Sequence, residues 1–473
     1  MPRITRHYVD VPLHDGRPDG GPDGAHRRVH YRMAGSGPPL MMIHQSPRNG
    51  GEYAALMQAW GAYFTCIAPD TPGFGQSDPL PGVPDINDFA DALVATMDAL
   101  GIAACPAYGF HSGGIILITA LKRHPNRFVG MAVGGYAIWT ANEMAIFGQS
   151  YLPPFQPSPY GEHLVWLWNR IVEQSWFFPW FDTRDAARLP GAHADIAIID
   201  MAVREMLDAG DAYRAGYGAV LRASRDIPPP DAITPPVLIS AYDSDPLQAH
   251  IDRLGDMPVG WRAQKCATAA LHQALSLEFL QALPVADPVI PRQSNDAGFV
   301  HLDAGGFSGL IHWQGDPAVR ILHIHRPGEE SDPAAGSAGG AGGGVAIDLP
   351  GHGLSDRWPG DAPDDWAAWR TVIDAAAAHF GITDIRLPDA PPGDPEQLFP
   401  DLSPDRFGSH LTRAWQMVRA RHFFAPPYAV SGSGAIAFDP ADLAPEQLAS
   451  EHRALLRATA ARAFCKALGN RQE

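Results

Sequence analysis

Cysteine, basic charge and long apolar runs are all scarce in this chain of 473 residues. The four cysteines stand far apart and match no metal-binding spacing, so we expect them to be reduced, as in a cytoplasmic protein. With 35 basic and 52 acidic residues the net charge is −17, which disfavours nucleic acid and anionic membrane as partners. No apolar stretch has the roughly 18 residues of a membrane span, and the first residues lack the apolar segment of a secretory signal.

What the chain does contain is enough apolar material for a large core, at 45% hydrophobic residues. Strand-like and helix-like segments alternate through the first part of the chain, which is typical of an α/β protein with a mostly parallel sheet. An aromatic-rich helical stretch interrupts this rhythm and predicts an inserted cap. We therefore expect a core formed by 1–137 and 227–288, a helical cap at 138–226, and a further region at 296–473.

The most informative motif is Gly109-Phe110-His111-Ser112-Gly113-Gly114, which separates a strand-like run from a helix-like one. A sharp turn of this kind needs small residues two before, two after and three after its tip, because strand and helix nearly touch there. With His111 at the tip all three positions hold glycine, whereas with Ser112 only one does. The motif resembles the nucleophile elbow of the α/β-hydrolase superfamily, with histidine where that family usually has Ser, Asp or Cys.

The resemblance covers about residues 8–285 and implies an α/β-hydrolase fold with an inserted helical cap. In that family the acid and the histidine follow the nucleophile in this order, which maps them to Asp245, with Asp243 nearby, and to His272. The resemblance implies that Asp245 orients the His272 imidazole, whose other ring nitrogen then moves protons.

His44-Gln45-Ser46-Pro47 is similar to the family's H-G-x-P turn, with Gln45 in place of glycine. The resemblance implies that the backbone N–H groups of Ser46 and Ser112 form an oxyanion hole. Some aromatic residues of the cap are expected to line the pocket, which would suit an apolar or aromatic substrate. The candidate residues for substrate binding are His44, Gln45, Ser46, His163 and Trp168.

The second half of the chain repeats motifs of the first half. The nine residues from Asp70 to Asp78 recur from Asp348 to Asp356 with six identities. The repeat has no elbow, acid or terminal histidine, so we expect a truncated, degenerate α/β-hydrolase-like copy that packs on the first as an intrachain pseudo-dimer. Residues 332–344 are rich in Gly and Ala and read as a flexible loop. Six cap residues also recur at a constant offset: Gly161, His163, Leu164, Trp168, Phe177 and Pro179 correspond to Gly408, His410, Leu411, Trp415, Phe424 and Pro426.

These features favour an enzyme that hydrolyses a small apolar or aromatic ester, lactone or C–C bond without cofactor or metal. Three mechanisms stay open: His111 as a nucleophile, His111 and His272 as an acid–base pair, or Ser112 reacting through a shifted turn. The acid–base pair of His111 and His272 would also suit a cofactor-free lyase or decarboxylase. A non-catalytic ligand-binding protein is the alternative of another class, and whether the chain forms a homodimer stays open.

Overall fold

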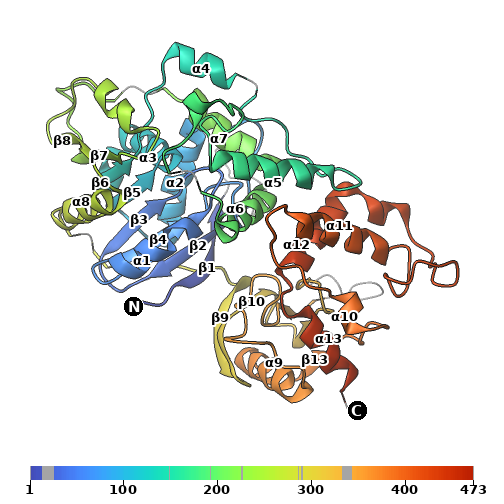
Figure 1. The fold of residues 1–473 in the computed structure, drawn as a ribbon. Coiled ribbons are helices and arrows are strands. Elements are labelled where there is room, and N and C mark those ends of the chain that lie inside the picture. The colour runs from blue at the N-terminus through green and yellow to red at the C-terminus, as the bar shows by residue number, and fades with distance from the viewer. Residues whose placement is uncertain are drawn as a thin grey trace. The chain divides into compact units, whose positions relative to one another are not determined.

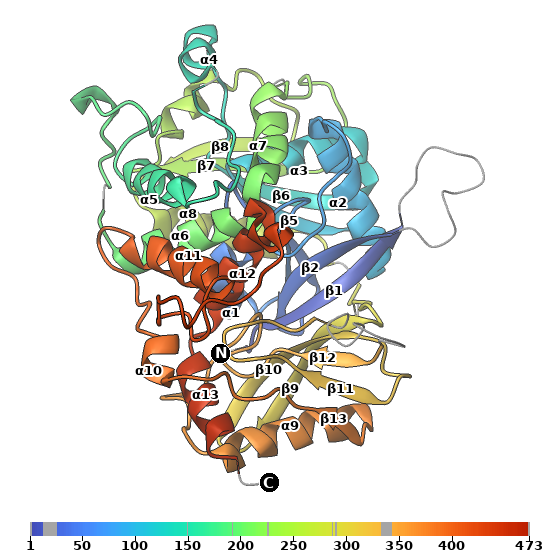
Figure 2. The same cartoon turned by 90° about the vertical axis from the view of Figure 1, so that its right-hand side faces the viewer.

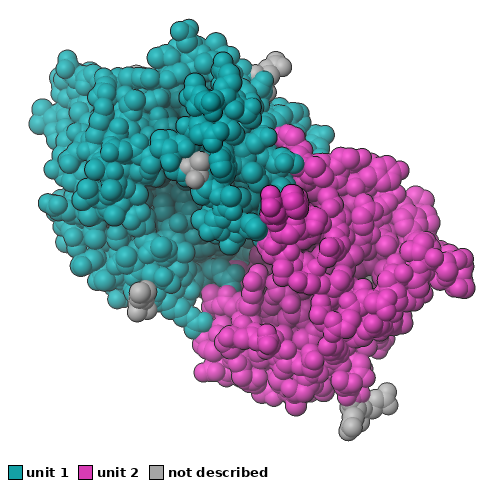
Figure 3. Space-filling model, viewed as in Figure 1, with its two compact units in different colours: residues 1–156, 168–293 teal, residues 157–167, 294–473 magenta. Residues whose placement is uncertain are grey.

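The computed structural model of the chain contains two compact units (Figure 1). Residues 1–156 and 168–293 form the first unit, and residues 157–167 and 294–473 form the second (Figure 3). In the part of the chain that the structure describes, no helix is both long and apolar enough to cross a membrane. The structure describes residues 2–12, 26–148, 150–191, 193–224, 227–285, 287–288, 291–332 and 343–471.

The first unit is built on a mixed sheet of eight described strands in the order β1-β2-β4-β3-β5-β6-β7-β8 (Figure 1). The pairs β1–β2 and β2–β4 are antiparallel, and all other neighbours are parallel, so the mostly parallel sheet expected from the alternating pattern is present. The strands are β1 (Thr5–Pro12), β2 (His26–Ala34), β3 (Pro39–Ile43), β4 (Thr65–Pro69), β5 (Cys105–Phe110), β6 (Phe128–Gly134), β7 (Val237–Tyr242) and β8 (Trp261–Cys266).

Both faces of this sheet are covered, which explains why its central strands are apolar throughout. Successive residues of β3 alternate between two cores: Met41 and Ile43 pack with α2 and α3, whereas Leu40 and Met42 pack with α1 and α8. The remaining helices, α4 to α7, precede β7 and belong to the predicted cap. The helices are α1 (Ala54–Trp60), α2 (Ile86–Leu100), α3 (Ser112–Arg123), α4 (Ala141–Phe147), α5 (Glu162–Gln174), α6 (Ile196–Ala209), α7 (Tyr213–Arg222) and α8 (Ala269–Gln281).

A buried carboxylate, Asp70, connects β2 to the segments that follow β3 and β4. It accepts hydrogen bonds from the His30 imidazole at 2.8 Å, from Arg32 at 2.8 Å and from the backbone N–H groups of Gly50 and Gln76 at 2.8 and 3.0 Å. Burial alone would raise the pKa of Asp70, but Arg32 and His30 outweigh it and hold the pKa below its usual range. The carboxylate is therefore charged, and it fixes the loop geometry around β3.

The second unit contains a smaller sheet of five described strands in the order β13-β11-β12-β10-β9, covered by α9 and α13 (Figure 2). Read in reverse, this order and its strand directions reproduce those of β1-β2-β4-β3-β5 in the first unit. The elements are β9 (Ala297–Ala304), β10 (Phe307–Gly315), β11 (Ile321–Ile324), β12 (Val345–Ile347), α9 (Trp366–Phe380), β13 (Asp384–Arg386), α10 (Pro395–Leu398), α11 (Ser409–Arg421), α12 (Pro445–Arg457) and α13 (Ala461–Gly469).

Each unit also contains the same set of hydrogen bonds around a buried aspartate, at matching positions. Asp348 accepts from the His312 imidazole at 2.9 Å and from the N–H groups of Ser331 and Leu354, as Asp70 does from His30, Gly50 and Gln76. The helices α5 and α11 have the same length, begin after Gly161 and Gly408 with positive φ, and precede matching bridges at Phe177 and Phe424. The two units therefore share these local arrangements, and a common origin of the two stays a prediction.

The compact units do not coincide with the expected cap at 138–226, because residues 157–167 belong to the second unit. The reason is a set of contacts with α11: the Trp415 indole and Arg419 donate hydrogen bonds to the carbonyl of Pro159, and the Trp415 ring packs on His163 at 4.8 Å. Of the predicted flexible loop, residues 333–342 lie outside the described residues.

Replacing Gly113 by alanine tests the close approach of α3 to the sheet. A Cβ at Gly113 would overlap the carbonyl oxygen of Ile43, and backbone cannot move away as a flexible side chain could. We expect Gly113→Ala to lower the unfolding free energy by more than about 2 kcal/mol in urea denaturation. Gly191→Ala is the matched control, because its nearest neighbour would be 3.9 Å away, and an equal effect of the two substitutions would contradict the close approach.

Candidate active site

The turn between β5 and α3 places His111 at its tip. Its backbone has φ 48° and ψ −114°, and among the described residues no other non-glycine residue has positive φ. The neighbouring glycines are needed for space: a Cβ at Gly109 would be 2.7 Å from the Leu117 side chain, and one at Gly114 would be 2.5 Å from Val133. The turn therefore has the geometry that the glycine pattern predicts for His111.

The His111 imidazole is hydrogen-bonded to Asp245, whose loop follows β7. The distance from Nε2 to the carboxylate is 3.0 Å, and the same oxygen accepts the backbone N–H of Leu247 at 2.9 Å. Burial would raise the pKa of Asp245, but the charge and hydrogen bond of His111 lower it below its usual value. The carboxylate is thus ionised, while the imidazole keeps about a quarter of its surface exposed.

The expected pairing of Asp245 with His272 is wrong. His272 lies inside α8 and is buried, with Nδ1 bonded to the hydroxyl of Ser240 at 2.8 Å and Nε2 to that of Tyr108 at 3.1 Å. Burial lowers its pKa to about 4, so the ring is neutral near pH 7. With both nitrogens engaged, His272 does not form the predicted acid–base pair with His111.

Ser112, the first residue of α3, is buried and does not stand at the tip of the turn. Its hydroxyl accepts the backbone N–H of Ser46 at 2.6 Å. The structure therefore brings together the two residues predicted to form an oxyanion hole. It also differs from that prediction, because the Ser46 N–H is satisfied by the Ser112 side chain.

His44 anchors the loop after β3 and does not face a substrate site as predicted. Its Nδ1 donates to the carbonyl of Gln45 at 3.0 Å, and its Nε2 accepts the backbone N–H of Thr71 at 2.8 Å. The ring is buried, and burial lowers its pKa to about 4. In the second unit His325 makes the matching bonds with Arg326 and Leu349, so this histidine joins two strand ends in both units.

Sequence reasoning missed Glu52, which follows the same loop. It accepts the backbone N–H of Gln45 at 3.3 Å, and burial raises its pKa to about 7 although Arg48 opposes the shift. It also missed Arg48, which forms an ion pair with Glu205 of α6 and so ties the cap to this loop. Neither residue belongs to a motif, and only the fold brings Glu205 to Arg48.

Two aromatic residues of the cap, Trp139 and Phe147, cluster beside His250, which lies in the helical turn after Asp245. Trp139 packs edge-on against His250 at 4.8 Å, and Phe147 lies at 4.8 Å from Trp139. Burial lowers the pKa of His250 to about 4. Phe110, the residue before His111, stacks on the His111 ring at 4.2 Å.

The two cap residues predicted to bind substrate are placed differently. The Nδ1 of His163 accepts the backbone N–H of Ser158 at 3.0 Å, within the segment that packs on α11 of the second unit. His410 begins α11 in a similar way: its backbone N–H donates to Asp405 at 3.2 Å, as that of His163 donates to Ser158 at 3.3 Å. Trp168 is a buried residue of α5, and its role in substrate binding stays a prediction.

Comparison with known proteins identifies relatives of the part of the chain that contains the elbow. A family model described as the alpha/beta hydrolase fold matches residues 38–153. Haloalkane dehalogenase 2 of Mycobacterium tuberculosis (strain H37Rv) is 30% identical over 138 residues, which are 28% of this chain and 48% of that protein. Soluble epoxide hydrolase of Corynebacterium sp. (strain C12) is 34% identical over 90 residues, 19% of this chain and 31% of its own length.

The chain thus spans less than half the length of these curated relatives. Among solved structures, Epoxide Hydrolase A from Mycobacterium thermoresistibile is similar over 55% of this chain and 96% of its own. Its sequence is 18% identical and the TM-score is 0.44.

The burial of His272 and His44 predicts a loss of stability in acid. Above pH 6.5 these rings are neutral in both states, whereas between pH 6.5 and 4 the unfolded chain takes up protons that the folded chain excludes. Each histidine should lower the unfolding free energy by about 1–2 kcal/mol between pH 7 and pH 5. Urea denaturation at several pH values measures this dependence.

The variant His272→Ala isolates one of these histidines. We expect it to cost about 2–4 kcal/mol at pH 7, because it opens a cavity and leaves the hydroxyls of Tyr108 and Ser240 without this partner. The substitution should also make the unfolding free energy less dependent on pH between pH 7 and pH 5. His124→Ala is the control, since His124 pairs with Asp91 near the surface. A His272→Ala protein as stable as the control would contradict the buried role.

Proposed function

The chain belongs to the α/β-hydrolase superfamily, and from that premise we propose that it hydrolyses a small apolar or aromatic ester or lactone. The observation that carries the proposal is the hydrogen bond between His111, at the tip of the elbow, and the ionised Asp245. A carboxylate bonded to one nitrogen of a partly exposed imidazole prepares the other nitrogen for proton transfer. His111 is thus the proposed general base.

In the proposed reaction Asp245 accepts the Nε2–H of His111, so that the lone pair of Nδ1 is free. Nδ1 removes a proton from a water molecule as its oxygen adds to the substrate carbonyl. Asp245 stabilises the resulting imidazolium, which returns the proton to the departing alkoxide. The products are a carboxylic acid and an alcohol, or a hydroxy acid from a lactone, and His111 regains its neutral form.

Water activation is preferred over covalent attack by His111 because of the nitrogen that stays free. Nδ1 lies next to the carbon that carries the Cβ, which crowds the approach of a carbonyl carbon more than that of a water molecule. The acid–base pair with His272 is not supported, since both nitrogens of that ring are bonded to Tyr108 and Ser240. This removes the reason to prefer a lyase or decarboxylase.

Ser112 is proposed to stabilise the negative oxygen that forms during the reaction. Its hydroxyl accepts the N–H of Ser46, which polarises the O–H and leaves its proton free to donate to the substrate. In this assignment Ser112 is the oxyanion donor and Ser46 its support. The Gln45 side chain takes the place of the family's glycine next to this group.

The substrate class follows from the residues around His111. Phe110 places aromatic surface on the proposed base, and Trp139 and Phe147 add aromatic surface beside His250, which suits an apolar or aromatic acyl group. The relatives are named for haloalkanes and epoxides, which are small molecules as well. The second unit is proposed to be a duplicated copy that lacks a catalytic turn.

Substitutions at the His–Asp pair test the proposed base. We expect Asp245→Asn and His111→Gln each to lower kcat/KM for p-nitrophenyl esters by about 10²–10⁴-fold, with the double variant no worse than the more damaged single variant. The surface pair of His124 and Asp91 provides the matched control, and His124→Gln should keep the wild-type rate. If the wild type binds ester analogues but releases no product, the protein is a binding protein and the proposal is wrong.

Rapid acid quenching distinguishes the two roles of His111. During turnover of a slow aryl ester we expect no acyl group on the protein, because water attacks the ester directly. Intact-mass spectrometry of the quenched protein measures this. An added acyl mass that maps to the His111 peptide would assign nucleophilic catalysis instead, and Ser112→Ala would then be expected to slow its formation.

A further inference from the structure

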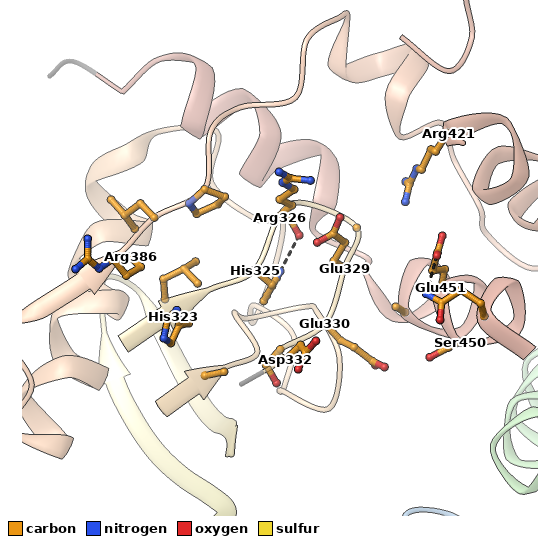
Figure 4. Close-up of a pocket in the computed structure, with 18 of the residues that line it drawn as sticks. His323, His325, Arg326, Glu329, Glu330, Asp332, Arg386, Arg421, Ser450 and Glu451 are labelled. Carbon is orange, nitrogen blue, oxygen red and sulfur yellow. Dashed lines mark hydrogen bonds between the residues drawn. The ribbon is translucent and has the colours of Figure 1, made fainter. Parts of the chain in front are cut away.

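The second unit contains a cavity of about 970 Å³ at the carboxyl ends of β11 and β13 (Figure 4). His325 and Arg326 line it directly after β11, and Leu387 and Pro388 line it directly after β13. The two strands are parallel neighbours. The strand that follows β11 in sequence, β12, pairs with one edge of β11, whereas the next strand, β13, pairs with the opposite edge. Such a reversal of strand order opens a crevice where ligands bind in α/β sheets.

Arg421, the last residue of α11, points its guanidinium into this cavity (Figure 4). Its Nη2 atom is buried and has no hydrogen-bond partner among the described residues. The group lies over the Phe399 ring at 5.5 Å and against Gly328, where a Cβ would be 3.1 Å from Nη2. Burial lowers the pKa of Arg421, while Glu329 and Glu451 act in the opposite direction, and an arginine stays charged in any case.

Two of the carboxylates at the cavity, Glu330 and Glu451, already have hydrogen-bond partners, and Glu329 lines it as well. Glu451 bonds to His422 at 3.0 Å and to Gln447 at 2.9 Å, and Glu330 bonds to Arg457 at 3.2 Å. The hydrogen-bond donor without a partner, Nη2 of Arg421, therefore belongs to a positively charged group. A ligand with one negative charge would satisfy it, whereas a doubly charged phosphate would be repelled by the surrounding carboxylates.

We propose that this cavity binds a small monocarboxylate with an apolar body. The carboxylate accepts hydrogen bonds from the Arg421 guanidinium, which suits this planar anion. The apolar body lies against Ile324, Leu387 and Ala454, which line the same cavity. The ligand site is separate from His111, because all its residues belong to the second unit, and it does not depend on the proposed hydrolysis.

Calorimetric titration of the full chain with benzoate tests the site. We expect a dissociation constant of about 1 mM or lower for the wild type and at least tenfold weaker binding for Arg421→Met, which keeps an apolar stem and removes the donor. Arg413→Met is the matched control on the same helix, since Arg413 is exposed and bonds to the Asp401 carbonyl. Leu387→Glu, which adds a negative charge to the lining of the same cavity, should weaken binding as well.

Any of the following results would contradict the proposal. Circular dichroism first establishes that every variant is folded. Absence of benzoate binding, or equal affinity of Arg421→Met and Arg413→Met, would show that Arg421 holds no carboxylate. Tighter binding of inorganic phosphate than of benzoate would exclude the monocarboxylate class. If benzoate binds at the first unit instead, His111→Gln should abolish binding and Arg421→Met should retain it. That pattern would also contradict the proposed site.

Discussion

The rest of the first unit depends on how closely α3 approaches the sheet behind β5. No Cβ can be accommodated at Gly113, because the carbonyl of Ile43 occupies that space. This contact forces the reversal of the chain between β5 and α3 and leaves His111 in a left-handed conformation at the tip. The position of the imidazole follows from this backbone constraint, and so does its reach to Asp245 across the strand ends.

The glycine pattern was enough to predict the elbow, because a close backbone approach leaves a direct trace in the sequence. The partner of Asp245 could not be predicted in the same way. It depends on which imidazole is within reach once the strands are aligned, and the resemblance to the family favoured His272. One local signal was available: the Thr268 side chain accepts the N–H of Leu271 and caps α8, which places His272 inside the helix and not in the preceding loop.

The resemblance also suggested three separate residues, a nucleophile, a histidine and an acid, whereas in the structure the residue at the elbow is itself a histidine bonded to the acid. The imidazole occupies the elbow itself and contacts the acid directly, and the residue in the family's histidine position supports the core. Glu52 and Arg48 show a different limit of sequence reasoning. Their contacts with Gln45 and Glu205 depend on the loop that Asp70 holds in place, and no spacing in the sequence predicts these contacts.

The segment 157–167 has a consequence for how the chain is connected. The polypeptide passes from the first unit to the second near residue 157, returns near 168, and passes over again near 294. A single cut between the units therefore cannot yield two polypeptides that each contain all of their own residues. A chain divided at one point between the units would separate α11 from Pro159 and Tyr160, whose carbonyls accept hydrogen bonds from Trp415 and Gln416.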